Sequence, residues 1–220
     1  MNKKKGSFLL LLLLYACFCA AQNYLAIGDS YTIGEAVEAT QRWPNQLTNL
    51  LNKNKKQINP PLIIAQTGWR TDEALKAVEN YKHSSTYDLI SVLIGVNNQY
   101  QKKELKQFEE DLRKILEKAI LLSSNGPKGV FALSIPDYGV TPFAENKHPE
   151  QIALEIDQYN QVYKNICKEY NILFLDITEI SRLAKSKPYL IAEDGLHPSG
   201  EMYKLWVESI ATSVEKLLEY

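Results

Sequence analysis

The chain has 220 residues, of which 45% are hydrophobic, and it carries 25 basic and 26 acidic side chains. This composition is typical of a globular protein and excludes a disordered or fibrous one. The near-zero charge predicts no basic surface that would attract nucleic acid, and the length suits one domain with a full hydrophobic core.

The first 21 residues have the layout of a secretory signal peptide. Three lysines near the start precede an apolar run over 8–21, which is shorter than the about 20 residues that a membrane-spanning helix needs. Small residues then precede Gln22, as a cleavage site requires. We therefore predict a signal peptide over 1–21, a single domain over 22–220, and export to the periplasm or to the outside of the cell.

Two alternatives for this segment stay open, an uncleaved membrane anchor and a lipoprotein signal. The sequence Leu-Tyr-Ala-Cys ending at Cys17 resembles a bacterial lipobox, although the bulky Tyr15 fits that pattern poorly. In the lipoprotein alternative, Cys17 would carry the lipid anchor.

Cysteine usage leaves a single thiol in the body of the protein. Cys17 and Cys19 fall in the leader, so only Cys167 remains, and one cysteine can neither form an intramolecular disulfide nor build a cysteine metal site. Apolar residues at helical spacing surround Cys167. We therefore predict a buried core residue there rather than a catalytic thiol.

Strand and helix patterns alternate along the body. Five short apolar runs without alternation predict strands buried on both faces, over 24–27, 62–65, 89–94, 130–135 and 172–175. Apolar stripes at steps of three and four residues predict five helices, over 43–51, 74–81, 105–120, 152–166 and 202–217. This order predicts an α/β fold with a five-stranded parallel sheet and helices on both faces.

Ligands on open parallel sheets bind at the carboxyl ends of the strands, so the chemistry is expected in the loops that follow them. The first such loop begins Gly28-Asp29-Ser30. A serine there is a candidate nucleophile if a base and an oxyanion site lie nearby. The alternative makes Asp29 or Ser30 a helix cap or turn residue.

The chain has three histidines that could supply the base: His83, His148 and His197. Asp194 precedes His197 by three residues, so its carboxylate can accept the Nδ1 proton and leave Nε2 free as a general base. The same segment also reads as the start of the last helix. His148 lies in a loop on the correct side of the sheet and is a second candidate, whereas His83 is expected on the solvated surface.

Two further loops offer hydrogen-bond donors for an oxyanion. Gly68 follows the second strand and could present a backbone N–H where a side chain would collide. Asn97 follows the third strand and could donate from its amide, and the N–H of Ser30 would be the third donor. Taken alone, Gly68 is an ordinary turn glycine and Asn97 an ordinary loop former.

These motifs together resemble the SGNH, or GDSL-type, hydrolase superfamily of esterases and lipases. The family pattern has Gly-Asp-Ser after the first strand, a glycine after the second, Gly-x-Asn-Asp after the third, and Asp-x-x-His near the carboxyl terminus. The resemblance implies a flavodoxin-like three-layer α/β/α sandwich. It also implies Ser30 as nucleophile, His197 as base, Asp194 as its orienting partner, and an oxyanion hole formed by Ser30, Gly68 and Asn97.

The sequence departs from the family pattern at two positions. Tyr31 stands where the family shorthand has leucine, and Asn98 stands where the family usually has aspartate. The second departure removes a charge near the site and puts in doubt any supporting role of that aspartate, but it leaves the Asn97 donor in place.

The resulting prediction is a serine esterase that needs no metal or cofactor. Its substrate is expected to be a small-molecule ester, a lipid or an acylated carbohydrate: a short-chain acyl ester, an O-acetyl-carbohydrate or a lysophospholipid. No obligate protein partner is indicated. Residues expected to line the substrate pocket are Trp69, Arg70, Tyr100 and Tyr138, with Arg42, Trp43 and Phe143 beside the same loops.

Two other functions are compatible with parts of this sequence. A non-catalytic carbohydrate-binding protein on the same fold would carry the triad by accident. A metal-dependent phosphatase could use Asp29, Asp137, Asp194 and His197, but it would leave Ser30, Gly68 and Asn97 without a role.

Overall fold

The computed structural model describes residues 21–219. The predicted signal peptide, with its alternative lipid anchor at Cys17, therefore lies outside the described residues except for its last position. Over 21–219, none of the helices combines the length and the apolarity needed to cross a bilayer.

The core is one sheet of five parallel strands in the order β2-β1-β3-β4-β5. Its strands are β1 (Tyr24–Gly28), β2 (Leu62–Ala65), β3 (Leu89–Leu93), β4 (Val130–Leu133) and β5 (Leu173–Leu175). β1, β3 and β4 are buried along their whole length, as their apolar runs predict. The same prediction is wrong for the edge strands β2 and β5, which are mostly half-buried because each has a neighbouring strand on one side only. The order reverses direction between β1 and β3. That reversal is where open parallel sheets bind ligands.

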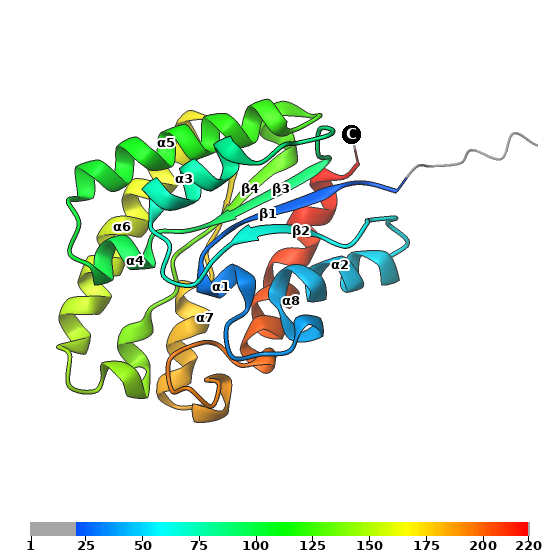
Figure 1. Cartoon of the computed structure of the whole chain (residues 1–220). Coiled ribbons are helices and arrows are strands. Elements are labelled where there is room, and N and C mark those ends of the chain that lie inside the picture. The colour runs from blue at the N-terminus through cyan, green and yellow to red at the C-terminus, as the bar shows by residue number, and fades with distance from the viewer. Residues whose placement is uncertain (1–20, 220) are drawn as a thin grey trace, which may run out of the picture.

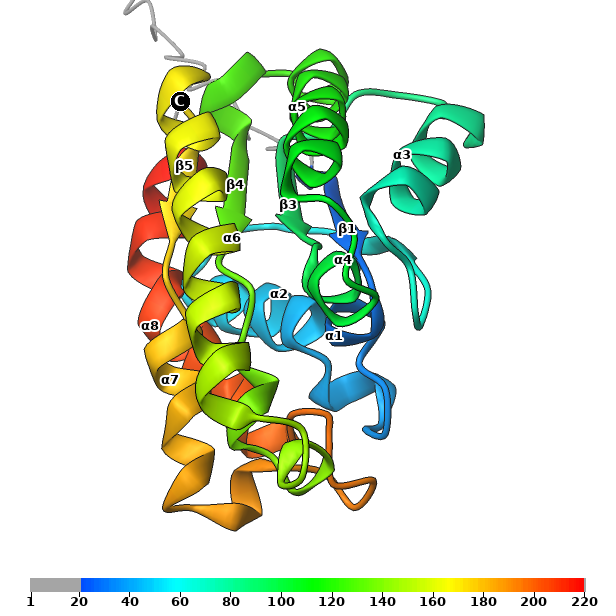
Figure 2. The ribbon, with the colours of Figure 1, turned by 90° about the vertical axis from the view of Figure 1, so that its left-hand side faces the viewer.

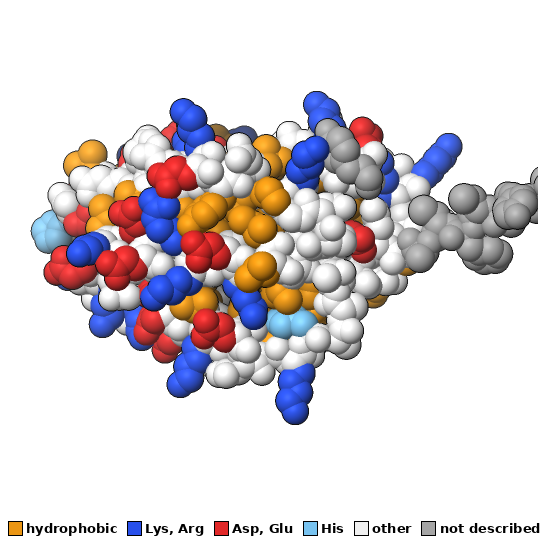
Figure 3. Space-filling view, turned by 90° about the horizontal axis from the view of Figure 1, so that it is seen from above, with side chains coloured by type: hydrophobic (Ala, Val, Ile, Leu, Met, Phe, Trp, Pro, Cys, Tyr) orange, Lys and Arg blue, Asp and Glu red, His pale blue; other side chains and the backbone are white. Residues whose placement is uncertain are grey.

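Two groups of helices cover the sheet and make the predicted three-layer α/β/α sandwich (Figure 1 and Figure 2). One face carries α2 (Trp43–Lys53) and α8 (Gly200–Leu217), which pack against each other. The other face carries α3 (Thr71–Asn80), α5 (Leu105–Leu122) and α6 (Pro149–Glu169). Figure 3 shows acidic and basic side chains intermixed on the face seen from above, in keeping with the near-zero charge.

Short helices lie in segments where the sequence pattern predicts no helix. They are α1 (Ser30–Ile33), α4 (Val96–Tyr100) and α7 (Thr178–Arg182). The 3-10 turns are η1 (Ala39–Gln41), η2 (Gly126–Gly129), η3 (Tyr138–Val140), η4 (Pro142–Ala144), η5 (Leu183–Lys185) and η6 (Pro188–Leu190). A helix of four or five residues spans little more than one turn, so it shows no apolar stripe that periodicity could detect.

The predicted core is largely buried. Cys167 is fully buried, which confirms its assignment to the core, and the five long helices turn their predicted stripes inward. β3 and β4 end before Ile94 and Ile135, where the predicted runs ended, yet both isoleucines stay buried, so the apolar run outlasts the hydrogen-bonded ladder. Tyr81 lies beyond the end of α3 and is exposed.

Candidate active site

A small pocket of about 130 Å³ lies at the carboxyl ends of β1, β2 and β3, and we call it the Ser30 pocket. It brings together the predicted nucleophile, base and oxyanion donors, Ser30, His197, Gly68 and Asn97, from loops far apart along the chain, and the predicted pocket residues Tyr100 and Tyr138 also line it. Its lining residues are Ser30, Tyr31, Thr67, Gly68, Val96, Asn97, Tyr100, Tyr138, Phe143, Leu196 and His197. Ser30 and His197 are 5% and 8% exposed, so both side chains are largely shielded from bulk water.

Ser30 is placed by a sharp turn from β1 into α1. Gly28 is required at this turn, because a Cβ there would lie 2.1 Å from Thr32 Oγ1 and 2.5 Å from the carbonyl oxygen of Leu93. Asp29 caps α1 by accepting a hydrogen bond from the backbone N–H of Tyr31 at 3.0 Å. The cap is therefore Asp29, which leaves Ser30 as the first helical residue with its side chain at the pocket.

Burial raises the pKa of the Asp29 carboxyl to about 7, although hydrogen bonds from the backbone of Tyr31, Asp29 and Gly95 partly offset the shift. A carboxyl sealed from water is penalised in its charged form. Asp29 thus lies directly behind Ser30, outside the pocket lining, and holds its proton more tightly than an exposed aspartate.

His197 is held by Asp194 through the turn that joins them. Asp194 Oδ2 accepts a hydrogen bond from His197 Nδ1 at 2.5 Å, and Oδ1 accepts from the backbone N–H groups of Leu196 and His197 at 3.0 and 2.9 Å. Burial raises the pKa of Asp194, but these hydrogen bonds outweigh it and leave the pKa below its ordinary value. The carboxylate fixes the proton on Nδ1, so Nε2 is left to accept a proton from a neighbouring hydroxyl.

Gly68 adopts a φ of +85°, in the left-handed region that favours glycine. The steric reason predicted for this glycine is wrong, because an added Cβ would meet nothing within 4 Å. The requirement is conformational. The turn at Gly68 brings its backbone to the pocket, and a side chain would strain that turn.

Asn97 joins the loops after β2 and β3. Its Nδ2 donates a hydrogen bond to the carbonyl oxygen of Trp69 at 2.9 Å, which fixes the orientation of the amide. A carboxamide nitrogen carries two hydrogens, so one remains for a ligand in the pocket.

Asn98 has a role that sequence reasoning did not find. It is buried, its Oδ1 accepts from the backbone N–H of Thr71 at 3.0 Å, and its Nδ2 donates to Thr71 Oγ1 at 2.8 Å. Thr71 opens α3, so this pair ties the loop after β3 to the helix that follows Gly68. An amide supplies both the acceptor and the donor, which an ionised aspartate could not do.

Three aromatic side chains that contact one another form one wall of the pocket. The ring centroids of Tyr100, Tyr138 and Phe143 lie 5.9–6.4 Å apart, and the ammonium of Lys147 lies 3.4 Å from the centroid of Phe143. The backbone N–H of Phe143 donates to the carbonyl oxygen of Gly195 at 3.0 Å. The aromatic wall is thereby attached to the turn that carries Asp194 and His197.

Other residues considered from the sequence are placed elsewhere. Trp69 and Arg70 are not among the pocket lining residues, and Arg70 instead pairs with Asp72 and Glu73. Trp43 is fully buried in the core.

Neither of the other histidines reaches the pocket. His148 is exposed at the start of α6. His83 is half-buried between the hydroxyl of Tyr87 and the carbonyl of Val78, rather than freely solvated as expected, because both ring nitrogens have hydrogen-bond partners.

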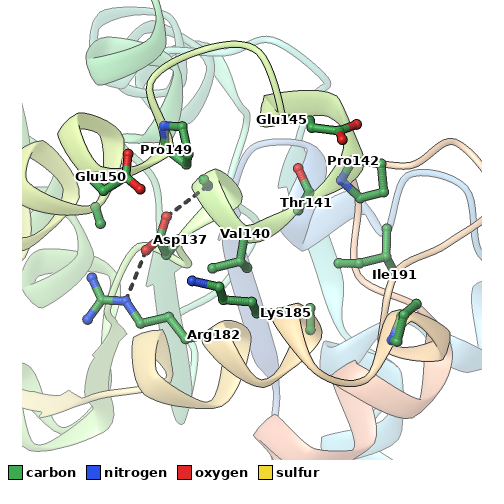
Figure 4. A pocket seen from close by; sticks show the side chains of 14 residues that line it. Asp137, Val140, Thr141, Pro142, Glu145, Pro149, Glu150, Arg182, Lys185 and Ile191 are labelled. Atoms are coloured by element: carbon green, nitrogen blue, oxygen red, sulfur yellow. Dashed lines mark hydrogen bonds and ion pairs between the residues drawn. The ribbon is translucent and has the colours of Figure 1, made fainter.

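A second, larger cleft of about 720 Å³ lies beyond the turn η3, and we call it the Arg182 cleft (Figure 4). Its lining residues are Asp137, Gly139, Val140, Thr141, Pro142, Glu145, Pro149, Glu150, Ala153, Arg182, Ala184, Lys185, Pro188 and Ile191. The buried Asp137 pairs with Arg182 Nε at 2.9 Å.

The ligand set of the metal-dependent alternative is thus divided, because Asp137 belongs to this cleft and His197 to the Ser30 pocket. Over residues 21–219, no cluster of three or more His, Cys, Asp or Glu side chains is arranged to hold a metal ion.

The model of the GDSL-like Lipase/Acylhydrolase family matches residues 26–205, a span that includes all four motifs. The chain belongs to this family. At family level it is an esterase, a hydrolase of carboxylic esters.

Named relatives agree with this membership. The chain is 22% identical over 214 residues to Thioesterase 1/protease 1/lysophospholipase L1 of Escherichia coli (strain K12), covering 97% of this chain and 93% of that protein. The structure of the lipase/acylhydrolase from Enterococcus faecalis aligns with a TM-score of 0.71 at 18% identity, over 89% of this chain and 96% of that one. The structure of Axe2, an acetylxylan esterase from Geobacillus stearothermophilus, aligns with a TM-score of 0.65 at 20% identity, over 90% of this chain and 94% of that one. These structural likenesses confirm the fold.

Replacing Asp29 with asparagine should change how stability depends on pH. The folded chain keeps the Asp29 proton up to about pH 7, whereas an unfolded carboxyl loses it near pH 4. The wild-type free energy of unfolding therefore loses up to about 1.4 kcal/mol per pH unit from this group as the pH rises between those values. Asp29→Asn has no carboxyl at this position, so its free energy of unfolding does not fall for this reason. The difference in stability between Asp29→Asn and wild type should therefore increase from about pH 4 to about pH 7 and stay constant above pH 7.

Urea unfolding at pH 4 to 8 measures this effect. Asp29→Ala is the matched control: it removes the cap and should be less stable than Asp29→Asn by about 1 kcal/mol at every pH, with the same pH slope. Parallel pH profiles for wild type and Asp29→Asn would show that Asp29 titrates normally.

Proposed function

We propose that the protein is a serine esterase that cleaves carboxylic esters by acyl transfer, with Ser30 as nucleophile, His197 as base and Asp194 as the group that orients His197. The observation that carries the proposal is the Ser30 pocket itself. Ser30 and His197 both line it, and His197 Nδ1 is bonded to Asp194 at 2.5 Å. An enzyme with a serine nucleophile needs an imidazole beside the serine hydroxyl, because a bare serine is a poor nucleophile.

In the first step, Ser30 Oγ attacks the ester carbonyl and His197 Nε2 takes the hydroxyl proton. The oxyanion that forms is stabilised by the N–H of Ser30, the N–H of Gly68 and the free amide hydrogen of Asn97. The N–H of Ser30 has no acceptor in its own helix because Ser30 is the first helical residue. His197 then gives its proton to the leaving alcohol, which leaves an acyl group on Ser30.

In the second step, water attacks the acyl-serine while His197 takes a proton from it. The same three donors stabilise the second oxyanion, and Oγ of Ser30 recovers its proton from His197. Asp194 stays ionised throughout and stabilises the imidazolium at each stage, a role that its lowered pKa supports. The cycle uses no metal ion or cofactor.

The pocket volume supports a short acyl group as substrate. A space of about 130 Å³ walled by Tyr100, Tyr138 and Phe143 accepts a few carbon atoms beside Ser30 and leaves the alcohol part outside. The named relatives include an acetylxylan esterase and a lysophospholipase. Among these classes, the volume favours a short ester or an O-acetyl-carbohydrate over a long-chain lysophospholipid. We also propose export of the mature chain through the leader 1–21.

Ser30→Ala should lose p-nitrophenyl acetate hydrolysis, because the substitution removes the hydroxyl that would form the acyl-enzyme. A fluorophosphonate probe should label the wild-type protein on Ser30, located by mass mapping of the labelled peptide. His197→Ala should reduce kcat by about 10³-fold or more. His148→Ala is the matched histidine control and should leave the rate unchanged, since His148 is exposed and outside the pocket.

Turnover retained by Ser30→Ala, or a label found on another residue, would contradict the nucleophile assignment. A chelator such as EDTA should leave the wild-type rate unchanged; inactivation by EDTA that Zn²⁺ or Mg²⁺ restores would favour the metal-dependent alternative instead.

Phe143→Ala should shift the preference towards longer acyl chains. Removing this ring opens one wall of the Ser30 pocket, and each methylene accommodated in an apolar pocket changes selectivity by about tenfold or more. The measurement is kcat/KM for p-nitrophenyl acetate, butyrate, hexanoate and octanoate. Tyr189→Ala, an exposed aromatic residue outside the pocket lining, is the control. A wild-type enzyme that already prefers octanoate would contradict the short-acyl assignment.

A further inference from the structure

Tyr31, one of the two departures from the family pattern, packs against the ring of His197. The two ring centroids lie 5.8 Å apart and the ring planes meet at 67°, an edge-to-face arrangement. Tyr31 is 4% exposed and lines the Ser30 pocket next to Ser30 in sequence and in space. It is thus an aromatic neighbour of the proposed base.

His197 needs a second restraint besides Asp194. The hydrogen bond from Nδ1 to Asp194 and the bond to Cβ hold one edge of the ring, but small rotations about χ1 and χ2 can still tilt the ring while that hydrogen bond persists. In the proposed function, such a tilt would move Nε2 relative to the Ser30 hydroxyl. A misplacement of about 1 Å between reacting groups costs about 100-fold in rate. The Tyr31 ring contacts the His197 ring from the side and is placed to limit this tilt.

Tyr31 is itself held firmly enough to act as a wall. Its ring contacts Trp206 of α8 with centroids 6.3 Å apart, and Trp206 in turn meets Tyr203 edge-to-face at 5.1 Å. Trp206 and Tyr203 are both fully buried. The ring of Tyr31 therefore stands between His197 and the rigid packing of α8, and it cannot retreat without disturbing that packing.

We propose that Tyr31 is the positioning residue that sets the plane of the His197 ring, so that Nε2 faces Ser30 Oγ. Ser30 and Tyr31 are consecutive residues of α1, so the turn that presents the nucleophile also presents the wall for the base. The role rests on the proposed function, because it concerns the approach of His197 to Ser30. Tyr31 acts through His197 and does not itself touch the reacting atoms.

The ring of Tyr31, and not its hydroxyl, carries this role. Burial raises the pKa of the Tyr31 phenol well above its ordinary value, with smaller contributions from nearby acidic groups that include Asp29 and Asp194, so the side chain stays neutral. The ionisable groups around His197 are Asp194 on its own turn, the Tyr31 phenol on α1, and the Tyr100 and Tyr138 phenols across the pocket. A phenyl ring at position 31 should therefore serve as well as the phenol.

The experiment compares Tyr31→Phe, Tyr31→Leu and Tyr159→Leu by steady-state hydrolysis of p-nitrophenyl acetate and by thermal unfolding. Tyr159 is the matched control: it is 6% exposed, lies on α6 and packs on Phe108 away from the pocket. We expect Tyr31→Leu to lower kcat by about 10- to 100-fold with little change in KM, since ground-state binding is not affected. Tyr31→Phe and Tyr159→Leu should keep the wild-type kcat.

A spectroscopic measurement follows the ring directly, without turnover. The proton that His197 shares with Asp194 should give a downfield ¹H signal in wild type and in Tyr31→Phe, and a broadened or shifted one in Tyr31→Leu. If Tyr31→Leu does not fold, Tyr31→Met replaces it, because methionine fills more of the space without a ring.

The proposal is overturned if folded Tyr31→Leu keeps the wild-type kcat and downfield signal. It is also overturned if Tyr31→Phe or the control Tyr159→Leu loses as much activity as Tyr31→Leu. These outcomes can be distinguished from failure of the proposed function. If the proposed function is wrong, fluorophosphonate does not label Ser30 in the wild-type protein, whichever residue is at position 31.

Discussion

The reversal of strand order between β1 and β3 is the constraint on which the candidate site depends. β2 lies to one side of β1 and β3 to the other, so the connections after β1 and β3 leave the sheet on opposite faces. The space between them cannot be filled by either crossover helix. Ser30 follows β1, Asn97 follows β3 and Gly68 follows β2, so all three arrive at the same opening although up to 67 residues separate them along the chain.

Hydrogen bonds between loops, more than the loops themselves, give this opening its shape. Asn97 bonds to Trp69, and Asn98 bonds to Thr71, so the connections after β2 and β3 are joined twice. The backbone N–H of Phe143 donates a hydrogen bond to the carbonyl oxygen of Gly195, which joins the aromatic wall to the turn that carries Asp194 and His197. The Asn98 and Thr71 groups are buried, and buried polar groups are costly unless their partners are present. This pair therefore makes the arrangement specific, because a loop that moved would leave these groups without a partner and without water.

The strands and the positions of Ser30, Asp194 and His197 could be predicted because each depends on local sequence. A run such as Leu-Ile-Ser-Val-Leu is apolar enough to be buried on both faces, and a glycine or aspartate after a strand marks its carboxyl end. The same local reasoning gave the wrong cause for Gly68, since the room around a residue depends on segments distant in sequence.

Roles that depend on long-range contacts stayed hidden for the same reason. The pairing of Asn98 with Thr71 joins residues that are 27 positions apart, and no local pattern indicates it. For Arg70 the sequence leaves two predictions open, a place in the pocket and a pairing with Asp72 or Glu73. The structure supports the pairing, and Gln101, which is distant in sequence, adds a further hydrogen bond to the guanidinium.

In the proposed function, substrate choice and reaction chemistry would be carried by different parts of this chain. The groups that would perform acyl transfer sit in the four motifs, whereas the aromatic wall of the Ser30 pocket comes from Tyr100 and the turn 138–143. That turn also bounds the Arg182 cleft on its other side, where Asp137 accepts from the N–H of Gly139 and pairs with Arg182. The ion pair therefore anchors the segment that carries part of the aromatic wall. Under the proposed function, a change at position 137 or 182 would act on the substrate through Tyr138 and not through Ser30, Asp194 or His197, so acyl-chain preference could vary without altering the acyl-transfer step.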